Sequence, residues 1–151
     1  MRPAVPAMMA ALLLGASPAM VGAEWTLKSG KNCVLESSPA SLSDGYQTTT
    51  ARVSVDAKSV LVSSPSVLDA GFKDIGIAVD EQPFIPMDRL ADPRTAVFES
   101  RHEALVEQFK RGLRARVQLR FWPTWPATGT HDVTVSLIGF TKAYAGLVEC
   151  K

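Results

Sequence analysis

The sequence has two histidines and many serines and carboxylates, but their spacing does not indicate a reaction centre. His102 shares a helical face with apolar residues, so we expect a partly buried, hydrogen-bonded ring rather than a metal ligand. His131 and Asp132 are adjacent, and adjacent residues on a strand point to opposite faces, which separates a base from an orienting carboxylate. We therefore expect no catalytic residues, no metal site and no cofactor.

A row of arginines is the first candidate binding surface. Arg114, Arg116 and Arg120 alternate with apolar residues, which places all three on one face of a strand. In a chain of nearly balanced charge they would form a positive strip for an anionic glycan, a lipid headgroup or an acidic protein. The row is also typical of an ordinary solvated sheet face whose arginines protect an edge strand from aggregation, and we favour this second interpretation.

The segment FWPTWP, residues 121–126, holds two of the three tryptophans of the chain. Trp122 and Trp125 each precede a proline, which favours extended backbone and places the two indoles on one side of the segment. They would then stack on sugar rings or hold a side chain of a partner. Alternatively, they close the rim of the core where the preceding strand ends, because tryptophan buries a large area. We favour the core plug.

The first residues have the layout of a secretory signal peptide. Arg2 is the only charge before Glu24, an apolar stretch follows it, and Val21-Gly22-Ala23 offers small residues for cleavage. This apolar stretch is shorter than the roughly 20 residues that span a bilayer, and no later segment is longer. We expect residues 1–23 to be removed and residues 24–151 to form one domain, periplasmic, secreted or at the cell surface.

The charge balance of the domain bears on its partners, and its cysteines bear on its compartment. Loss of Arg2 leaves as many basic as acidic side chains, so the domain lacks the basic excess with which proteins bind nucleic acid.

Cys33 and Cys150 lie near opposite ends of the domain, and cysteines of exported proteins usually pair. A redox pair would have the CxxC spacing, which is absent. We predict a disulfide between them, which by loop entropy contributes at most about 4–5 kcal/mol.

Alternation of apolar and polar residues predicts that most of the chain is β-structure. The clearest strands are residues 46–55 and 113–121, and the second turns Leu113, Ala115, Val117, Leu119 and Phe121 inward. We expect 84–87 at a sheet edge, because Pro86 has no N–H to donate. The polar run 36–45 is expected to be a loop. Shorter strands are predicted at 25–27, 33–35, 58–63, 74–79 and 133–137.

Two stretches have the helical period instead. In the first, residues 101–111, Ser100 and Glu103 have the spacing of a capping box, and Gly112 is expected to end the helix in the left-handed region. The second, residues 140–149, has an apolar stripe, in which we expect burial of Phe140, Tyr144 and Leu147, with Ala143 and Val148 on the same face. Together the elements predict a mainly β protein, an antiparallel β-sandwich with two short helices.

The residues at the end of the predicted strand 133–137 and after it resemble those of a known protein family. Ser136-Leu137-Ile138-Gly139-Phe140-Thr141-Lys142-Ala143 resembles the ending of the invasion-associated locus B family, in which a strand runs into S-L-x-G-F-x-x-A. The resemblance covers residues 74–148. Gly139 permits the tight corner between strand and helix, and Phe140 turns inward. The family commonly has cysteines in the part that corresponds to residues 84–98, where this chain has none, which leaves Cys33 and Cys150 as the one candidate pair.

The resemblance implies a β-sandwich, export to the periplasm or cell surface, a link to host-cell entry in some members, and no known catalytic chemistry. We therefore expect a non-enzymatic exported protein that binds a protein or an envelope component. Its partner would be an envelope protein, a host protein or an anionic glycan. Two other classes remain open: a small periplasmic enzyme whose site is built from scattered residues, and an inhibitor or chaperone-like binder.

Overall fold

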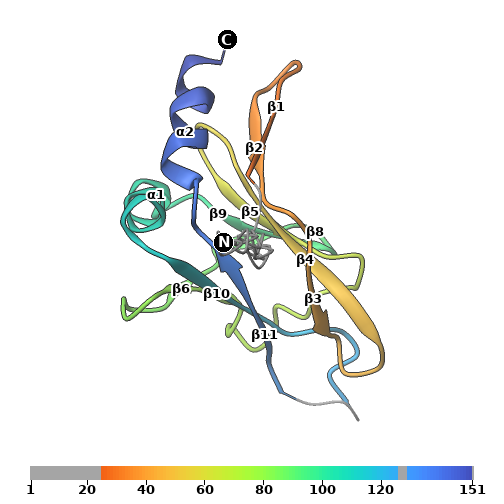
Figure 1. The fold of residues 1–151 in the computed structure, drawn as a ribbon. Helices are drawn as coiled ribbons and strands as arrows, with labels where there is room; N and C mark the ends of the chain where they lie inside the picture. Colours follow the sequence, from red (N-terminus) through yellow and green to blue (C-terminus); the bar gives the residue numbers. More distant parts are fainter. Residues whose placement is uncertain (1–24, 126–128, 151) are drawn as a thin grey trace, which may run out of the picture.

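The computed structural model describes residues 25–125 and 129–150, so the predicted signal peptide and its cleavage site lie outside the described residues. The described chain forms two antiparallel sheets and two helices (Figure 1). One sheet has seven strands in the order β1-β2-β4-β5-β9-β8, with β3 paired to β4, and the other has four in the order β11-β10-β6-β7. The predicted antiparallel β-sandwich with two short helices is confirmed.

The seven-stranded sheet is built around β4, whose alternation the sequence predicts. Ala51, Val53 and Val55 are buried, while the residues between them are half-buried on the outer face. The predicted loop 36–45 is wrong in part, because β3 lies within it and pairs with β4. The strands are β1 (Thr26–Lys28), β2 (Val34–Glu36), β3 (Ala40–Ser43), β4 (Thr48–Val55), β5 (Val60–Ser63), β8 (Arg89–Asp92) and β9 (Thr95–Phe98).

The four-stranded sheet has β10 at its centre, between β11 and β6. Val117 of β10 pairs with Val133 on one side and Ile77 on the other. The expectation that the arginines of β10 protect an edge strand is therefore wrong, whereas β7 does lie at the edge as predicted. Leu113, expected inward, precedes the strand and is 66% exposed. The strands are β6 (Gly76–Val79), β7 (Ile85–Pro86), β10 (Arg114–Leu119) and β11 (His131–Ser136).

Helix α1 (His102–Arg111) connects β9 of one sheet to β10 of the other and buries Leu105, Val106 and Phe109. The predicted capping box is wrong, because the Ser100 hydroxyl donates to Asp88 Oδ1 at 2.5 Å and the cap residue, Arg101, makes no side-chain cap bond. No helix in the described residues is long and apolar enough to cross a membrane.

The residue that ends α1 is extended rather than left-handed, which corrects the prediction for Gly112. The reason for glycine at this position is close packing. A Cβ atom there would lie 2.4 Å from Val79 Cγ1 and 2.9 Å from the Gln108 carbonyl oxygen. Absence of a side chain thus lets the end of α1 lie directly against the end of β6.

Helix α2 (Phe140–Glu149) begins after Gly139, whose φ of 83° confirms the expected tight corner. Phe140 and Leu147 are buried as predicted, Tyr144 is half-buried, and Val148 is exposed, so the apolar stripe is narrower than predicted. The helix packs against β1 and β2. A disulfide joins Cys33 to Cys150 with a Cα–Cα distance of 6.1 Å and fastens the end of α2 to the start of β2.

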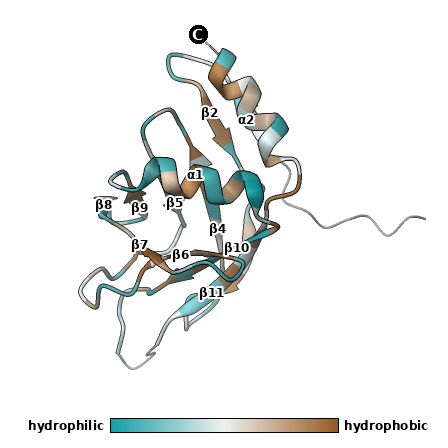
Figure 2. Ribbon diagram, turned by 90° about the vertical axis from the view of Figure 1, so that its left-hand side faces the viewer, coloured by the Kyte–Doolittle hydropathy of each residue, from teal (hydrophilic) through white to brown (hydrophobic). Residues whose placement is uncertain are grey.

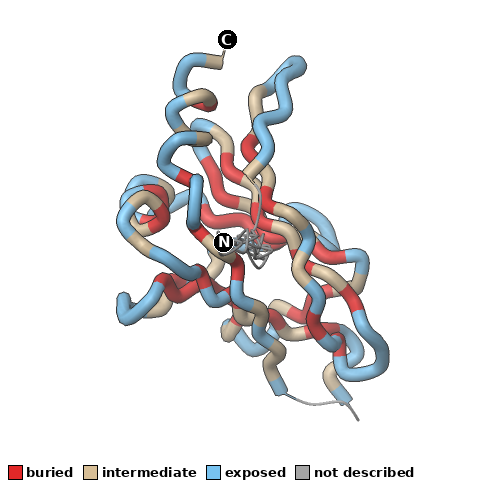
Figure 3. Tube along the Cα trace, viewed as in Figure 1, coloured by how far each residue is buried: buried red, intermediate tan, exposed pale blue. Residues whose placement is uncertain are grey.

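The core lies between the two sheets and extends beneath both helices. Buried segments are concentrated in the strands, and the hairpin turns are exposed (Figure 3). Hydrophobic residues lie on parts of β2 and β7, whereas α1 carries both hydrophobic and hydrophilic residues along its length (Figure 2). Beside the helices, Trp25, Phe109 and Phe140 pack edge to face or tilted with centroids 5.0–6.3 Å apart, and Tyr144 stacks on Phe140.

Candidate binding surface

Four exposed aromatic side chains gather on the loops at the end of the molecule remote from α2. Trp122 is 64% exposed, Trp125 80%, Tyr46 53% and Phe72 57%. They come from the β3–β4 turn, the loop between β5 and β6, and the loop after β10, and Figure 1 shows the first and last of these loops side by side at the bottom. We call these four residues the aromatic end.

The core-plug interpretation of the two tryptophans is wrong. Phe121 is the aromatic residue that closes the core where β10 ends, because it is 3% exposed and forms a bridge with Leu68. The alternation of β10 turns Phe121 inward, and the chain then leaves the sheet. Trp122 and Trp125 follow on the departing loop and face solvent.

Hydrogen bonds between the loops hold the aromatic end in place. The Tyr46 hydroxyl donates to the carbonyl oxygen of Pro123 at 3.1 Å. The backbone N–H of Trp122 donates to the Val67 carbonyl at 2.8 Å, and the Thr124 hydroxyl donates to the carboxylate of Asp69. The rings are therefore presented on loops that bond to each other.

Asp44 fixes the turn that carries Tyr46. Its Oδ1 accepts the backbone N–H groups of Tyr46 and Gln47, each at 2.8 Å, and its Oδ2 accepts the Ser66 hydroxyl at 2.8 Å. Burial acts to raise the pKa of Asp44, but the hydrogen bonds from Gln47, Tyr46 and Ser66 favour the ionised form and hold the pKa below its ordinary value.

Arg120 supports the aromatic end instead of offering a free charge. Its guanidinium makes hydrogen bonds with Asp74 at 2.9 and 2.5 Å, and its side chain is only 13% exposed. These hydrogen bonds raise the pKa of Arg120. The guanidinium also lies 4.2 Å from the centroid of the Phe72 ring, a cation–π contact.

The other two arginines of the row do not join this surface. Arg116 forms an ion pair with Asp132 at 3.7 Å, and both side chains are about half-exposed. Arg114 is exposed at the opposite end of β10. A strand rises by about 3.3 Å per residue, which separates Arg114 from Arg120 by about 20 Å. The row is on one face as predicted, but ion pairing neutralises two of its three charges.

The remaining chemistry-bearing residues are accounted for locally. His102 Nε2 lies 3.0 Å from the carbonyl oxygen of Asp56, in agreement with the expected half-buried, hydrogen-bonded ring. The ring of His131 lies beside Phe121, with centroids 6.1 Å apart, while Asp132 pairs with Arg116. Within the described residues no group of histidine, cysteine or carboxylate side chains is arranged to hold a metal ion.

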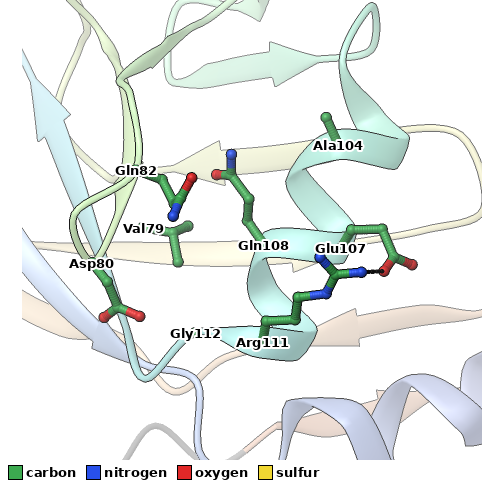
Figure 4. Close-up of a pocket in the computed structure, with 8 residues that line it drawn as sticks. All are labelled: Val79, Asp80, Gln82, Ala104, Glu107, Gln108, Arg111 and Gly112. Atoms are coloured by element: carbon green, nitrogen blue, oxygen red, sulfur yellow. Dashed lines mark ion pairs between the residues drawn. The ribbon is translucent and has the colours of Figure 1, made fainter.

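A separate pocket of about 350 Å³ lies between α1 and the turn after β6 (Figure 4). The carboxylate of Asp80 accepts the backbone N–H groups of Leu113 and Arg114 at 3.0 and 3.1 Å, which fixes the connection between α1 and β10. Hydrogen-bonding and charged groups make up its polar wall, and no serine, cysteine or histidine lines it. The lining residues are Val79, Asp80, Gln82, Ala104, Glu107, Gln108, Arg111 and Gly112.

Sequence reasoning missed two members of the aromatic end, Tyr46 and Phe72. Each directly follows a glycine, at Asp44-Gly45-Tyr46 and Ala70-Gly71-Phe72. A glycine is typical of a surface turn, so a large aromatic residue next to it is a signal of exposure that was available.

Two antiparallel sheets packed face to face, with short helices closing the sandwich beside them, define a β-sandwich protein. The chain is similar to a solved structure, invasion associated protein B from Bartonella henselae. The two share 18% sequence identity with a TM-score of 0.58, and the match covers 84% of this chain and 93% of the Bartonella chain. The protein thus has the fold of invasion associated protein B, over more of the chain than residues 74–148. The sequence matches no protein-family model and no curated protein.

Proposed function

We propose that the protein acts outside the cytoplasm as a non-enzymatic binding protein, and that the aromatic end is the surface that contacts a protein or an envelope component. The observation that carries this proposal is the exposure of Tyr46, Phe72, Trp122 and Trp125 on loops that hydrogen-bond to each other. Clustered aromatic residues are rare on surfaces without partners and are enriched at the centres of interfaces.

The support beneath the rings favours binding over incidental exposure. Asp44, Asp69 and Asp74 each accept hydrogen bonds that fix one of the contributing loops. Because these bonds already fix the described parts of the loops, the protein would lose less conformational entropy on binding than it would with mobile loops. More than half of each of the four residues remains exposed, so apolar area is available to a partner.

Three features support a location outside the cytoplasm. The chain begins with the layout of a signal peptide, and its two cysteines form a disulfide, a bond typical of oxidising compartments. The structure with the same fold carries the description "invasion associated". Together with the resemblance of residues 136–143 to the invasion-associated locus B family, for which export is expected, this supports a place at the cell envelope. Intact mass of the exported protein tests this half of the proposal, which requires a chain that starts at Glu24.

Affinity capture from envelope and host-cell extracts tests the binding half. The bait is the chain 24–151, beside a Trp122→Ala/Trp125→Ala double variant and a Leu113→Ala control, whose residue is as exposed as Trp122 but lies outside the aromatic end. We expect a stoichiometric partner retained by the wild type and the control and lost by the double variant. Equal recovery by all three proteins would contradict the proposed surface, and turnover of a metabolite pool would favour an enzyme instead.

A further inference from the structure

A second candidate site lies on the outer face of the seven-stranded sheet, at the break between β2 and β3. Arg52 of β4 and Ser63 of β5 are paired in register, and Thr50 lies two residues before Arg52, so the three side chains share one face. Together they line a pocket of about 250 Å³, whose other residues are Pro39, Ser64 and Pro65.

Several hydrogen-bond donors in the pocket have no acceptor among the described residues. Arg52 Nε is buried without a hydrogen-bond partner among the described residues, so an outside acceptor reaches this guanidinium, which can only donate, at its Nη groups. The Arg52 side chain as a whole is 40% exposed. The hydroxyls of Thr50 and Ser63 likewise have no partner in the described part of the chain. The Ser64 hydroxyl differs, because it already accepts the backbone N–H of Ser66 at 3.2 Å. The Arg52 guanidinium and the hydroxyls of Thr50 and Ser63, on two adjacent strands, are thus open to an outside acceptor.

The charge around the pocket favours an anion. Arg52 Nη1 lies 3.5 Å from Glu36 Oε2, and Lys28 Nζ lies 2.9 Å from the same oxygen, so two cations share one carboxylate. At the rim, Arg94 Nε donates to the Pro65 carbonyl at 2.9 Å, which brings another guanidinium to the wall. None of the residues that line the pocket is acidic.

We infer that this pocket binds a tetrahedral oxyanion, a sulfate or phosphate group, independently of the aromatic end. The Arg52 guanidinium supplies the charge and an N–H donor, and Thr50 and Ser63 supply O–H donors to other oxygens of the group. A tetrahedral group suits three donors on separate side chains better than a carboxylate, which has two oxygens. The pocket holds a single such group, either free or carried as a substituent on a glycan or a lipid.

Titration of the ¹⁵N-labelled chain 24–151 with inorganic sulfate, at an ionic strength held constant with chloride, tests the site by NMR. We expect saturable shifts of the Thr50, Arg52, Ser63 and Ser64 amides. Arg52→Gln should lose at least about tenfold in affinity, within the range of a charge-assisted hydrogen bond to a guanidinium. Arg89→Gln removes the same charge from β8 of the same sheet, where Arg89 pairs with Glu99 at 2.5 Å, and should bind sulfate as the wild type does.

Thr50→Val separates a built site from general attraction to positive charge. This variant keeps the shape and charge of the pocket and removes one donor, so we expect sulfate to bind several-fold more weakly. Shifts that do not saturate, or equal affinity in the wild type, Arg52→Gln and Thr50→Val, would overturn the inference. Binding of a sulfated oligosaccharide and of phosphatidylglycerol vesicles, each in competition with sulfate, then identifies the carrier of the anionic group. The carrier is the one of the two that binds more tightly than free sulfate.

Discussion

Two groups of aromatic residues occupy opposite ends of this fold and are used in opposite ways. At the helix end, Trp25, Phe109, Phe140 and Tyr144 pack on one another, and the Trp25 indole donates to the Ser136 carbonyl at 3.0 Å. At the aromatic end, four rings of similar size face solvent. The difference shows that residue type alone does not decide whether an aromatic side chain serves the core or a surface.

The two ends are also held together by different interactions. The helix end is fastened by apolar contact and by the disulfide between Cys33 and Cys150. At the aromatic end, buried or half-buried carboxylates such as Asp44 and Asp69 bond to backbone and hydroxyl groups. Because polar groups fix most of the loops at the aromatic end, the four rings there contribute little to stability and stay more than half exposed.

Loss of the disulfide should have the largest effect on stability. The bond closes a loop with a sequence separation of 117, so replacement of both Cys33 and Cys150 by serine should lower the free energy of unfolding by up to about 4–5 kcal/mol. Urea unfolding of the variant and the oxidised wild type measures this difference. The bond itself would be contradicted if two thiols per chain react in the unreduced, denatured wild type.

Phe140→Ala should follow closely, because the ring is fully buried at the centre of the packed group. Its removal should cost about 3–5 kcal/mol, the range for a buried phenylalanine. Phe72→Ala at the aromatic end is the comparison variant and should cost about 1 kcal/mol at most, because the ring is exposed and its contact with Arg120 is a surface cation–π contact. Equal melting temperatures for Phe140→Ala and the wild type would mean that α2 is a surface appendage.

A smaller, pH-dependent effect should follow from Asp44. The pKa of Asp44 in the folded protein lies below its ordinary value of 3.8, so its contribution to stability is complete above pH 3.8 and is lost as the pH falls through the folded-state pKa. Asp44→Asn should lack this part of the acid dependence, and Ser66→Ala should retain most of it. Denaturant unfolding between pH 2 and 6 measures this dependence. The same change in the free energy of unfolding with pH in the wild type and in Asp44→Asn would contradict the role of Asp44.

The smallest effect on stability should come from the exposed tryptophans. Trp122→Ala and Trp125→Ala should each shift the free energy of unfolding by about 0.5 kcal/mol or less, since both indoles are mostly solvated. Loss of partner binding by variants of unchanged stability would sharpen the contrast between the two ends. A loss of several kcal/mol on either substitution would instead support the interpretation that the tryptophans are part of the core.

Much of the fold can be predicted from local patterns, and the failures have physical causes. β4, β10 and α2 were predictable because one face of each is buried, which imposes a period on the sequence. β3 was missed because only Leu42 of its four residues faces the core. β8 was missed because a register shift between Leu90 and Asp92 interrupts its alternation, and β9 was missed because three of its four residues are buried and do not alternate.

The candidate surface was less predictable, because its geometry depends on partners distant in sequence. The spacing of Ser100 suggests a cap, but Asp88, from the turn before β8, takes its hydroxyl. Likewise, the alternation of β10 predicts that Phe121 is buried, but it does not indicate that the chain leaves the sheet one residue later. The exposure of Trp122 therefore follows from how the loops meet at that end.

Acrylamide quenching of tryptophan fluorescence tests the contrast between the two ends most directly. Trp25→Phe leaves only the two exposed indoles, and Trp122→Phe/Trp125→Phe leaves only Trp25 of the packed group. We predict red-shifted, strongly quenched emission from Trp25→Phe and blue-shifted, weakly quenched emission from the double variant. Equal quenching of the two proteins, or stronger quenching of the double variant, would contradict the assignment of the aromatic end as a free surface.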